Sequence, residues 1–477
     1  MQRVRSFFPL NLRAVFIYLA ALLRPFGVVL VLPALVALLA GELLYAAIFA
    51  ALALACFFLG RNVDFKAIVL DFQEALVVTA AAYLLFAVIA ALPFLPATPF
   101  LDSFFESMSG ITTTGLSVVD VERLPVSLLF FRAYLQWVGG AGIIIISLVM
   151  FLKPGKASFQ LYASEFGREN LVGSIFATAK LVIKIYFILT AIGFVVFIAV
   201  GMSPFDSLLH ILSTVSTGGF SPYRDSMARF GGGDTELVNP AVTMFMVLGA
   251  ITFPLYYTLF KGGWKQFSRD LQVRGLVLLI AFTSLLFLFF SSSRPDFVPA
   301  LFEAASAVTT TGFSVSDPAV WPEARKFFGT VMMMIGGSGG SSAGGIKIVR
   351  LLLLLKMVHW SIQRSTLPPE AKVVCKYDGQ PVARTAIIQT ATLFFVYLLM
   401  LVFSMLVLSL YGFPVVDALF ESASALGTVG LSAGITSAGL SSGCKLLLIF
   451  DMWAGRLEIL PVLILFYPGT WLWKKGF

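Results

Sequence analysis

Threonine and glycine recur in this sequence in four copies of one pattern, at Thr113–Gly115, Thr217–Gly219, Thr310–Gly312 and Thr428–Gly430. A threonine hydroxyl is an oxygen ligand, and glycine allows φ > 0, which helps successive carbonyl groups point the same way. Four such loops around one axis would form rings of carbonyl oxygens, and such rings replace the hydration shell of a potassium ion. The predicted potassium-binding residues are Thr112, Thr113, Thr114, Gly115, Ser216, Thr217, Gly218, Gly219, Thr309, Thr310, Thr311, Gly312, Gly427, Thr428, Val429 and Gly430.

Each Thr-x-Gly loop ends a short motif that aligns without gaps in all four copies. The last glycine stands 13 residues after the first residue of the motif every time (115 − 102, 219 − 206, 312 − 299 and 430 − 417). Each motif overlaps a short apolar segment of about 11 residues, too short to span a membrane. One Thr-x-Gly would be only a loop signature, whereas four matched copies indicate fourfold pseudo-symmetry. The short segments are 101–111, 205–215, 298–308 and 416–426.

The composition places these loops in a membrane protein. Of 477 residues, 59% are hydrophobic and 12% are charged, against about 25% charged residues in soluble domains. This argues against a soluble enzyme, a secreted disulfide scaffold and a nucleic-acid binder. Ten apolar stretches are long enough to cross about 30 Å of hydrocarbon. They are 13–39, 41–59, 68–95, 126–152, 176–201, 238–260, 272–291, 326–357, 385–412 and 444–472.

The order of long and short stretches predicts the fold. We expect an all-α polytopic membrane protein with an uncleaved N-terminal two-helix hairpin. Four units of long helix, short pore helix, loop and long helix then surround one ion pore. The predicted divisions are the hairpin at 1–60, the four units at 61–152, 153–260, 261–357 and 381–477, and a cytoplasmic linker at 358–380.

Lysine and arginine are distributed unevenly between the two sides. If the short segments enter from outside, eight basic residues lie outside and two, Arg24 and Arg456, lie within spans, which leaves 33 − 8 − 2 = 23 inside. This excess orients the Thr-x-Gly loops outward. The net charge of 33 − 25 = +8 therefore need not imply an anionic partner. The outer residues are Arg123, Arg132, Arg224, Arg229, Arg294, Arg325, Lys326 and Lys445.

A glycine-rich segment interrupts the second long helix of the third unit. Six glycines and three serines in ten residues hold a straight helix poorly. A helix-packing motif of small residues accounts for one or two of these glycines but not six. We therefore expect a broken helix inside a span. The segment reads Gly336, Gly337, Ser338, Gly339, Gly340, Ser341, Ser342, Ala343, Gly344 and Gly345, and Lys347 follows it.

Arg456 lies inside the last apolar stretch. An arginine at membrane depth is a candidate functional residue. A structural ion pair with Glu458 or Asp451 is the alternative, and the role of Asp451 itself is open.

Together, the four loops, the glycine-rich segment and the motif Gly455-Arg456-Leu457-Glu458 resemble the Trk/Ktr/HKT superfamily of potassium transporters, most closely its TrkH type. The resemblance covers nearly the whole chain. It implies that the loops form a selectivity filter, a reduced form of the potassium-channel Thr-Val-Gly-Tyr-Gly pattern. It also implies that residues 336–345 obstruct the pore below the filter as a gate, with Lys347 at their end. Arg456 would project into the conduction path as an electrostatic barrier.

The same resemblance implies partners and a location. It implies a homodimer in the bacterial inner membrane and a cytoplasmic nucleotide-binding RCK subunit similar to TrkA. The basic stretch 360–384, with Arg364, Lys372, Lys376 and Arg384, would be part of the docking surface, although an ordinary positive-inside loop explains it equally. We expect potassium as the transported ion, membrane lipid around the protein, no bound cofactor and no nucleic acid.

One position in the four short helices is occupied by Glu106, His210, Glu303 and Glu421. Acidic residues in the first half of a helix are favoured by its dipole. We therefore favour a capping and packing role over concentration of cations at the outer mouth.

The function that these features favour is potassium translocation driven largely by the membrane potential. A sodium-permeable or mixed sodium–potassium member of the same superfamily is the first alternative. A secondary transporter of a small solute with broken helices is a second, although such proteins usually show two repeats rather than four. The sequence contains no paired catalytic carboxylates, HExxH motif or Ser/His arrangement that would indicate an intramembrane enzyme.

Overall fold

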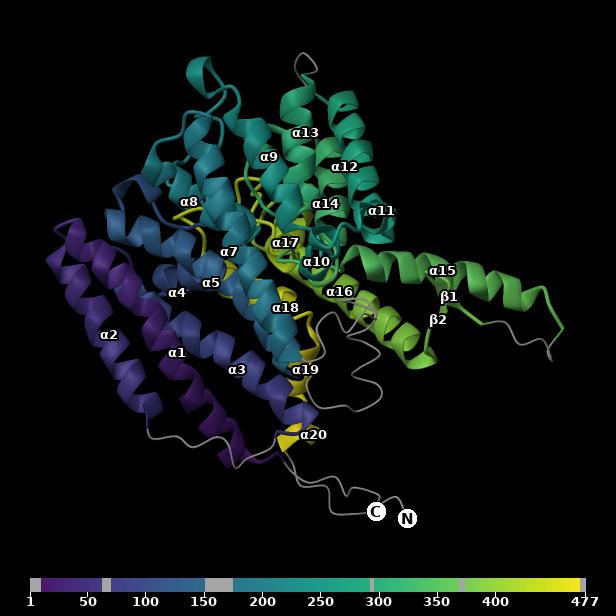
Figure 1. The fold of residues 1–477 in the computed structure, drawn as a ribbon, viewed down its shortest axis with the longest axis horizontal. Coiled ribbons are helices and arrows are strands. Elements are labelled where there is room, and N and C mark those ends of the chain that lie inside the picture. Colours follow the sequence, from purple (N-terminus) through teal and green to yellow (C-terminus); the bar gives the residue numbers. More distant parts are fainter. Residues whose placement is uncertain (1–9, 62–69, 151–174, 292–295, 369–373, 472–477) are drawn as a thin grey trace.

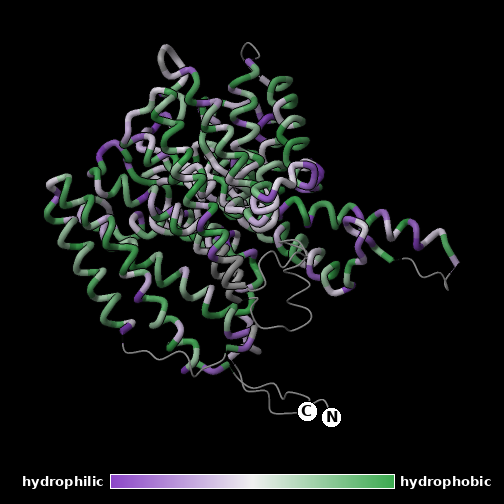
Figure 2. The backbone as a smooth tube through the Cα atoms, in the orientation of Figure 1, coloured by the Kyte–Doolittle hydropathy of each residue, from purple (hydrophilic) through white to green (hydrophobic). Residues whose placement is uncertain are grey.

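The structure, a computed structural model, describes residues 10–61, 70–150, 175–291, 296–368 and 374–471. These residues form a helical body (Figure 1), which confirms the predicted all-α membrane fold. Six helices are long and apolar enough to cross a membrane, or seven if one bent pair counts as a single span. Figure 2 shows that the long outer helices are hydrophobic along most of their length. Apolar surface of this kind is stable only against lipid.

The N-terminal hairpin consists of α1 (Leu12–Leu39) and α2 (Leu43–Arg61), as the sequence predicts. The turn between them uses Gly41 at φ 75°, a conformation that glycine adopts without strain. The carboxylate of Glu42 then accepts hydrogen bonds from the backbone N–H groups of Val126 (2.8 Å) and Ser127 (3.1 Å). These bonds fix the hairpin to the first turn of a helix in repeat 1.

Each repeat contains a long helix, a short helix and a second long helix that is continuous or broken. The first helices are α3 (Phe72–Ala91), α7 (Ile175–Ala199), α12 (Leu271–Phe289) and α16 (Arg384–Leu410). The short helices are α4 (Phe100–Ile111), α8 (Pro204–Val215), α13 (Phe297–Val308) and α17 (Val415–Leu426). The second helices begin with α5 (Val126–Met150), α9 (Val238–Gly249), α14 (Glu323–Ile335) and α18 (Ser442–Arg456).

Three of the four second helices are broken, whereas we expected a break only in repeat 3. In repeat 2, α9 and α10 (Phe253–Phe260) meet at 98°. In repeat 4, α18 is followed by α19 (Leu460–Phe466), with positive φ at Glu458 and Ile459. The stretches 238–260 and 444–472, which we expected as spans without a break, are therefore interrupted helices. The reason is that Pro254 and Pro461 open the new helices, and proline cannot continue the preceding one.

The break in repeat 3 is as predicted. Helix α14 ends at Ile335, and α15 (Ile348–Ser365) begins after the glycine-rich segment. Figure 1 shows α15 extending away from the helical body beside a two-stranded hairpin, β1 (Lys376–Tyr377) and β2 (Gln380–Pro381). Helix α15 runs through residue 358, where the linker is predicted to begin.

The remaining elements are short. They are α11 (Trp264–Arg269), α20 (Pro468–Trp471) and four 3₁₀ turns at Leu92–Phe94, Val121–Arg123, Gly233–Thr235 and Pro318–Val320. Some of the basic residues that we counted on the two sides lie outside the described residues. They are Arg294 of the outer set and Arg3, Arg5, Lys66, Lys153, Lys156, Arg168, Lys372, Lys474 and Lys475 of the inner set.

The repeats follow one another around a ring. The second helix of each repeat packs against the short helix of the next: α5 on α8, α9 on α13, α14 on α17, and α18 on α4. Each short helix buries an apolar side chain at one equivalent position, Phe105, Leu209, Phe302 or Phe420. The four short helices are thus enclosed by long ones, and their C-terminal ends lead into the four Thr-x-Gly loops.

Candidate ion-conduction site

The four Thr-x-Gly loops share one unusual backbone conformation. Their threonines have φ between 50° and 56°, at Thr113, Thr217, Thr310 and Thr428. A β-branched residue rarely adopts this left-handed conformation, because its side chain crowds the backbone. The glycines that follow also have positive φ, 92° at Gly115, 75° at Gly219, 87° at Gly312 and 99° at Gly430. This repeated strain indicates that the surrounding structure holds all four loops in a defined shape.

The loop glycines pack in a cycle against carbonyl groups of the next repeat. A Cβ atom added to Gly115 would overlap the Gly218 carbonyl oxygen, and one on Gly219 would overlap that of Thr311. The cycle continues from Gly312 to Val429 and closes from Gly430 to Thr114. Each loop therefore presents the carbonyl of its middle residue to the neighbouring loop. Any larger residue at these glycines would displace an oxygen of the ring.

One cavity connects the four loops to the protein surface. It has a volume of about 810 Å³, and Gly115, Gly219, Gly312 and Gly430 all line it. Asp120 and Arg224 also line it and form a 2.6 Å ion pair between repeats 1 and 2. The Arg224 guanidinium holds the pKa of the Asp120 carboxyl below its usual range, so the pair stays charged at neutral pH. The four loops thus meet at the floor of one vestibule.

The four polar residues that share one position in the short helices are all fully buried. They are Glu106, His210, Glu303 and Glu421. Glu106 accepts a hydrogen bond from Ser117 (3.0 Å), and Glu421 accepts one from Ser432 (2.8 Å). Glu303 accepts from Ser316, and His210 lies 3.3 Å from the Ser221 hydroxyl. Each side chain therefore holds the chain just after its own loop. These bonds support the packing role that the sequence favours for these residues.

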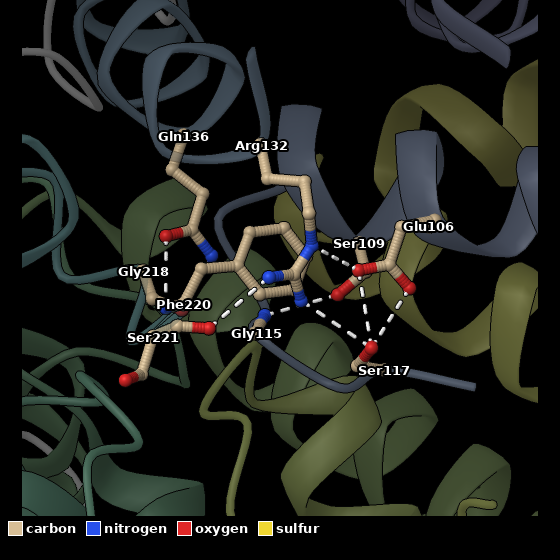
Figure 3. A network of polar contacts seen from close by, with 9 residues as sticks. All are labelled: Glu106, Ser109, Gly115, Ser117, Arg132, Gln136, Gly218, Phe220 and Ser221. Carbon is tan, nitrogen blue, oxygen red and sulfur yellow. Dashed lines mark hydrogen bonds and ion pairs between the residues drawn. The ribbon is translucent and has the colours of Figure 1, made fainter. Parts of the chain in front are cut away.

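Arg132 connects the first two loops (Figure 3). Its Nε lies 2.5 Å from the Glu106 carboxylate, and both side chains are almost fully buried. A second nitrogen donates to the Ser221 carbonyl oxygen (3.1 Å), and the guanidinium lies 4.0 Å from the centre of the Phe220 ring. A buried charge requires such partners. Arg325 pairs with Glu303 in repeat 3 in the same manner.

Gln136, one helical turn after Arg132 on α5, contacts the second loop directly (Figure 3). Its Nε2 donates to the Gly218 carbonyl oxygen (2.6 Å), and its Oε1 accepts from the Phe220 N–H (3.0 Å). Neither Gln136 nor Arg132 was singled out as a site residue from the sequence. The signal that could have found them is a polar residue inside an apolar stretch, spaced four apart so that both face one side of a helix.

Two further ion pairs join neighbouring repeats. Lys326 of α14 lies 2.7 Å from Asp417 of α17, and Lys445 of α18 lies 2.6 Å from Asp102 of α4. With Arg132 and Arg325, these account for four of the eight basic residues that we counted on the outer side. All four are buried and paired with carboxylates. On the side of the protein that carries these residues, fewer basic groups are exposed than the sequence count indicates.

The glycine-rich segment lies directly under the loops. The Gly344 N–H donates to the Thr310 hydroxyl (2.7 Å), and a Cβ on Gly344 would overlap the Gly427 carbonyl oxygen and the Thr428 hydroxyl. The Ser342 hydroxyl donates to the carbonyl oxygens of Val215 and Gly249, both at 2.9 Å. The segment therefore contacts the loops of repeats 3 and 4 and the end of short helix α8.

Arg456 lies against this segment. It donates to the Ser342 carbonyl oxygen (2.8 Å) and to the Gly139 carbonyl oxygen (3.1 Å), and it is 4% exposed. Glu458 pairs instead with Arg350 at 2.5 Å. Among the described residues, Arg456 has no carboxylate within 4 Å. The alternative of a structural ion pair with Glu458 or Asp451 is therefore wrong. The two hydrogen-bond partners of Arg456 are carbonyl oxygens instead.

Asp451 faces away from the loops. Its carboxylate accepts a hydrogen bond from Ser404 of α16 (2.9 Å), and its second oxygen has no hydrogen-bond partner. The side chain is 1% exposed, so it belongs to the contact between α18 and α16.

Comparison with known proteins decides the family. The model of the TrkH family, described as a cation transport protein, matches residues 46–475. The chain belongs to the TrkH family. TrkH-family relatives include the Trk system potassium uptake protein TrkH of Vibrio parahaemolyticus, which is 31% identical over 97% of this chain and 100% of that protein. They also include the Escherichia coli TrkG protein, 30% identical over 84% of this chain and 85% of that protein.

The three-dimensional comparison agrees. The crystal structure of the potassium transporter TrkH from Vibrio parahaemolyticus superposes with a TM-score of 0.83 and 30% identity, covering 97% of this chain and all of that one. An uncharacterised cation transporter of Methanocaldococcus jannaschii is 30% identical over 83% of each chain. The predicted resemblance to this family is confirmed, and the chain is a multi-pass membrane protein of a cation-transport family.

Proposed function

We propose that this protein moves potassium across the membrane through one central pore whose selectivity filter is made by the four Thr-x-Gly loops. The observation that carries the proposal is the closed cycle in which each loop glycine abuts a carbonyl oxygen of the next repeat. Because the same four glycines line one outer cavity, an ion that enters it meets all four loops. Rings of carbonyl oxygens replace the hydration shell of potassium.

The short helices add to the attraction for a cation. The helices α4, α8, α13 and α17 each end at a Thr-x-Gly loop. Since the C-terminal end of a helix carries about half a negative elementary charge, four such ends favour a cation at the loops. The membrane potential supplies about 2.3 kcal/mol per elementary charge per 100 mV, and we propose that it drives most of the inward movement.

We further propose that residues 336–345, with Lys347 and Arg456, form the gate. The segment fills the space under the filter, where Gly344 contacts Thr310, Gly427 and Thr428. Arg456 holds it through the Ser342 carbonyl and places a positive charge below the filter, where it repels potassium. The Lys347 ammonium donates to the Ala343 carbonyl oxygen at the end of the segment.

The proposed setting is the inner membrane of a bacterium, with the filter facing outward. The uneven distribution of lysine and arginine supports this orientation. We propose a homodimer regulated by a cytoplasmic nucleotide-binding RCK subunit similar to TrkA. Its docking surface includes 360–384, of which Arg364 is exposed at the end of α15. Related proteins are named as members of a Trk system, which supports a multi-component assembly.

The test is growth rescue and ion flux. A bacterium that lacks its potassium-uptake systems should grow on low-potassium medium when it expresses this protein. Purified protein in liposomes should take up rubidium, a potassium substitute, down an imposed potential. Uptake of sodium at the same rate as rubidium would instead support the sodium-permeable alternative. Failure of both rescue and ion flux, with uptake of an organic solute, would support the secondary-transporter alternative.

A further inference from the structure

We propose that Gln136 is a selectivity-determining residue that fixes the position of one filter carbonyl, that of Gly218, from the neighbouring repeat. This inference rests on the proposed function, because it treats the Gly218 carbonyl as part of the filter. Gln136 belongs to α5 of repeat 1, whereas Gly218 belongs to the loop of repeat 2.

The Gln136 amide bonds the second loop both as a donor and as an acceptor. It donates from Nε2 to the Gly218 carbonyl oxygen (2.6 Å) and accepts at Oε1 from the Phe220 N–H (3.0 Å). Gly219, the filter glycine, lies between these two points. A carbonyl can only accept and an N–H can only donate, so the orientation of the amide is unambiguous. A methionine or a carboxylate could not make both bonds.

Gly218 and Gln136 are complementary in size. The middle residue of the loop is Thr114, Thr311 or Val429 in the other three repeats, and glycine only in repeat 2. A Cβ at Gly218 would overlap the Gln136 amide group. The glutamine therefore occupies the room that a side chain fills elsewhere, and the same carbonyl that it holds lies against Gly115 of the first loop.

The other repeats have a different residue where α5 has Gln136. A Cβ atom added to Gly139, Gly249 or Gly455 would meet the carbonyl oxygen of the last residue of its own short helix, so these three glycines are equivalent. Counting three residues back from them gives Gln136, Met246 and Met452, and the same count from Gly336 of the third repeat gives Met333. Methionine has no hydrogen to donate. Among the described residues, a bond from this helix position to the middle carbonyl of the next loop is therefore found only between repeats 1 and 2, from Gln136 to Gly218.

Arg132 extends the same contact. It donates to the Ser221 carbonyl oxygen (3.1 Å) and covers the Phe220 ring. Helix α5 thus holds the second loop at Gly218, Phe220 and Ser221 (Figure 3). A carbonyl held in this way resists moving toward a smaller ion. Because selectivity depends on the size and field of the oxygen cage, we expect Gln136 to favour potassium over sodium.

The experiment compares Gln136→Met with Met246→Leu, the control at the equivalent position of repeat 2. Rubidium and sodium fluxes are measured in liposomes, and the ratio of the two is the readout. Gln136→Met should lower the rubidium-to-sodium ratio by about fivefold or more, the effect of leaving one buried carbonyl unsatisfied. Met246→Leu should keep the wild-type ratio. An unchanged ratio in Gln136→Met would overturn the inference.

A second measurement is needed in case a variant conducts too poorly for its fluxes to be compared. Potassium and sodium are compared as stabilisers of the purified protein against thermal unfolding, which does not require an open gate. Gln136→Met should lose the preference for potassium, and an intact preference would contradict the proposal. Gly218→Ala should also lose it, and Gly218→Ala combined with Gln136→Ala, which removes the overlap, should recover part of the stability. A wild-type protein that binds neither ion would refute the proposed function itself, before any variant is compared.

Discussion

The backbone N–H of Gly344 donates a 2.7 Å hydrogen bond to the hydroxyl of Thr310. This bond joins the glycine-rich segment to the third Thr-x-Gly loop. If the loops form the proposed filter, the segment occupies a hydroxyl group that an ion at this level would otherwise contact. The gate proposal can therefore be tested at one specific atomic contact.

Replacing Gly344 with alanine should open the gate. The new methyl group would overlap the Gly427 carbonyl oxygen and the Thr428 hydroxyl, and such overpacking costs about 1–3 kcal/mol. We expect rubidium flux in the absence of any regulatory subunit to rise at least about fivefold, since 1 kcal/mol corresponds to about that ratio. Gly439→Ala is the control, because a Cβ there meets nothing within 4 Å. Equal flux in the two variants would contradict the contact.

Removing the charge of Arg456 should also raise unregulated flux. Arg456→Ala deletes both bonds to carbonyl groups and the positive charge below the filter, whereas Arg456→Lys retains the charge. We expect the alanine variant to conduct faster than the lysine variant in liposome flux assays. Shortening 336–345 should have the same effect as Arg456→Ala. Wild-type rates in both the alanine variant and the shortened one would rule out the gate.

Gly115→Ser should weaken discrimination between potassium and sodium. Gly115 has φ 92°, which strains any other residue, and a serine Cβ would overlap the Gly218 carbonyl oxygen. We expect the rubidium-to-sodium flux ratio to fall by about tenfold, which corresponds to ~1.4 kcal/mol of differential ion binding. A variant that conducts with the wild-type ratio would show that the first loop is not part of the filter.

Breaking the ion pair between Glu106 and Arg132 should destabilise the protein. Glu106→Gln leaves the Arg132 guanidinium buried without its carboxylate, and loss of one partner of a buried pair costs about 3–5 kcal/mol. We expect a clear drop in the thermal unfolding midpoint of the purified protein. Glu122→Gln, at a half-exposed carboxylate of the outer loop, should leave the midpoint almost unchanged. Similar unfolding midpoints for the two variants would show that loss of the Glu106 carboxylate does not destabilise the protein.

Asp451→Asn should be tolerated. The buried Asp451 carboxyl has one partner, Ser404, and one unpaired oxygen, so a negative charge there is poorly compensated. Asparagine keeps an oxygen for the Ser404 hydroxyl. We expect the unfolding midpoint and the rubidium flux to equal or exceed those of the wild type. A marked loss of flux with normal stability would assign Asp451 a part in transport.

The sequence predicts the repeated architecture well because local patterns determine it. A short apolar segment before a Thr-x-Gly loop, such as 101–111 before Thr113, can be recognised from neighbouring residues alone. The break at 336–345 is predictable for the same reason, since its glycines are adjacent. The breaks near Pro254 and Pro461 are missing from the prediction because both stretches are apolar over a length that suits a span, although proline is a known helix breaker.

Partners across the ring were not predictable. Gln136 and Gly218 are separated by 82 positions, and Arg456 and Ser342 by 114. The sequence around Arg456 does not show whether its side chain pairs with Glu458, two residues away, or with a distant carbonyl group. The reason is that the direction of the side chain depends on how the helix ends. In the same way, Arg132 and Arg325 count as outer charges by position, and only the packing of α5 and α14 shows that they are buried.

The contact between Lys445 and Asp102 spans 343 positions of the chain and closes the ring between the last repeat and the first. Gly430, which abuts the Thr114 carbonyl, belongs to the same final repeat. A ribosome makes the chain from its N-terminus, so Asp102 and Thr114 are synthesised long before the residues that they contact. The ring of four loops can therefore close only after the C-terminal quarter of the chain has been made.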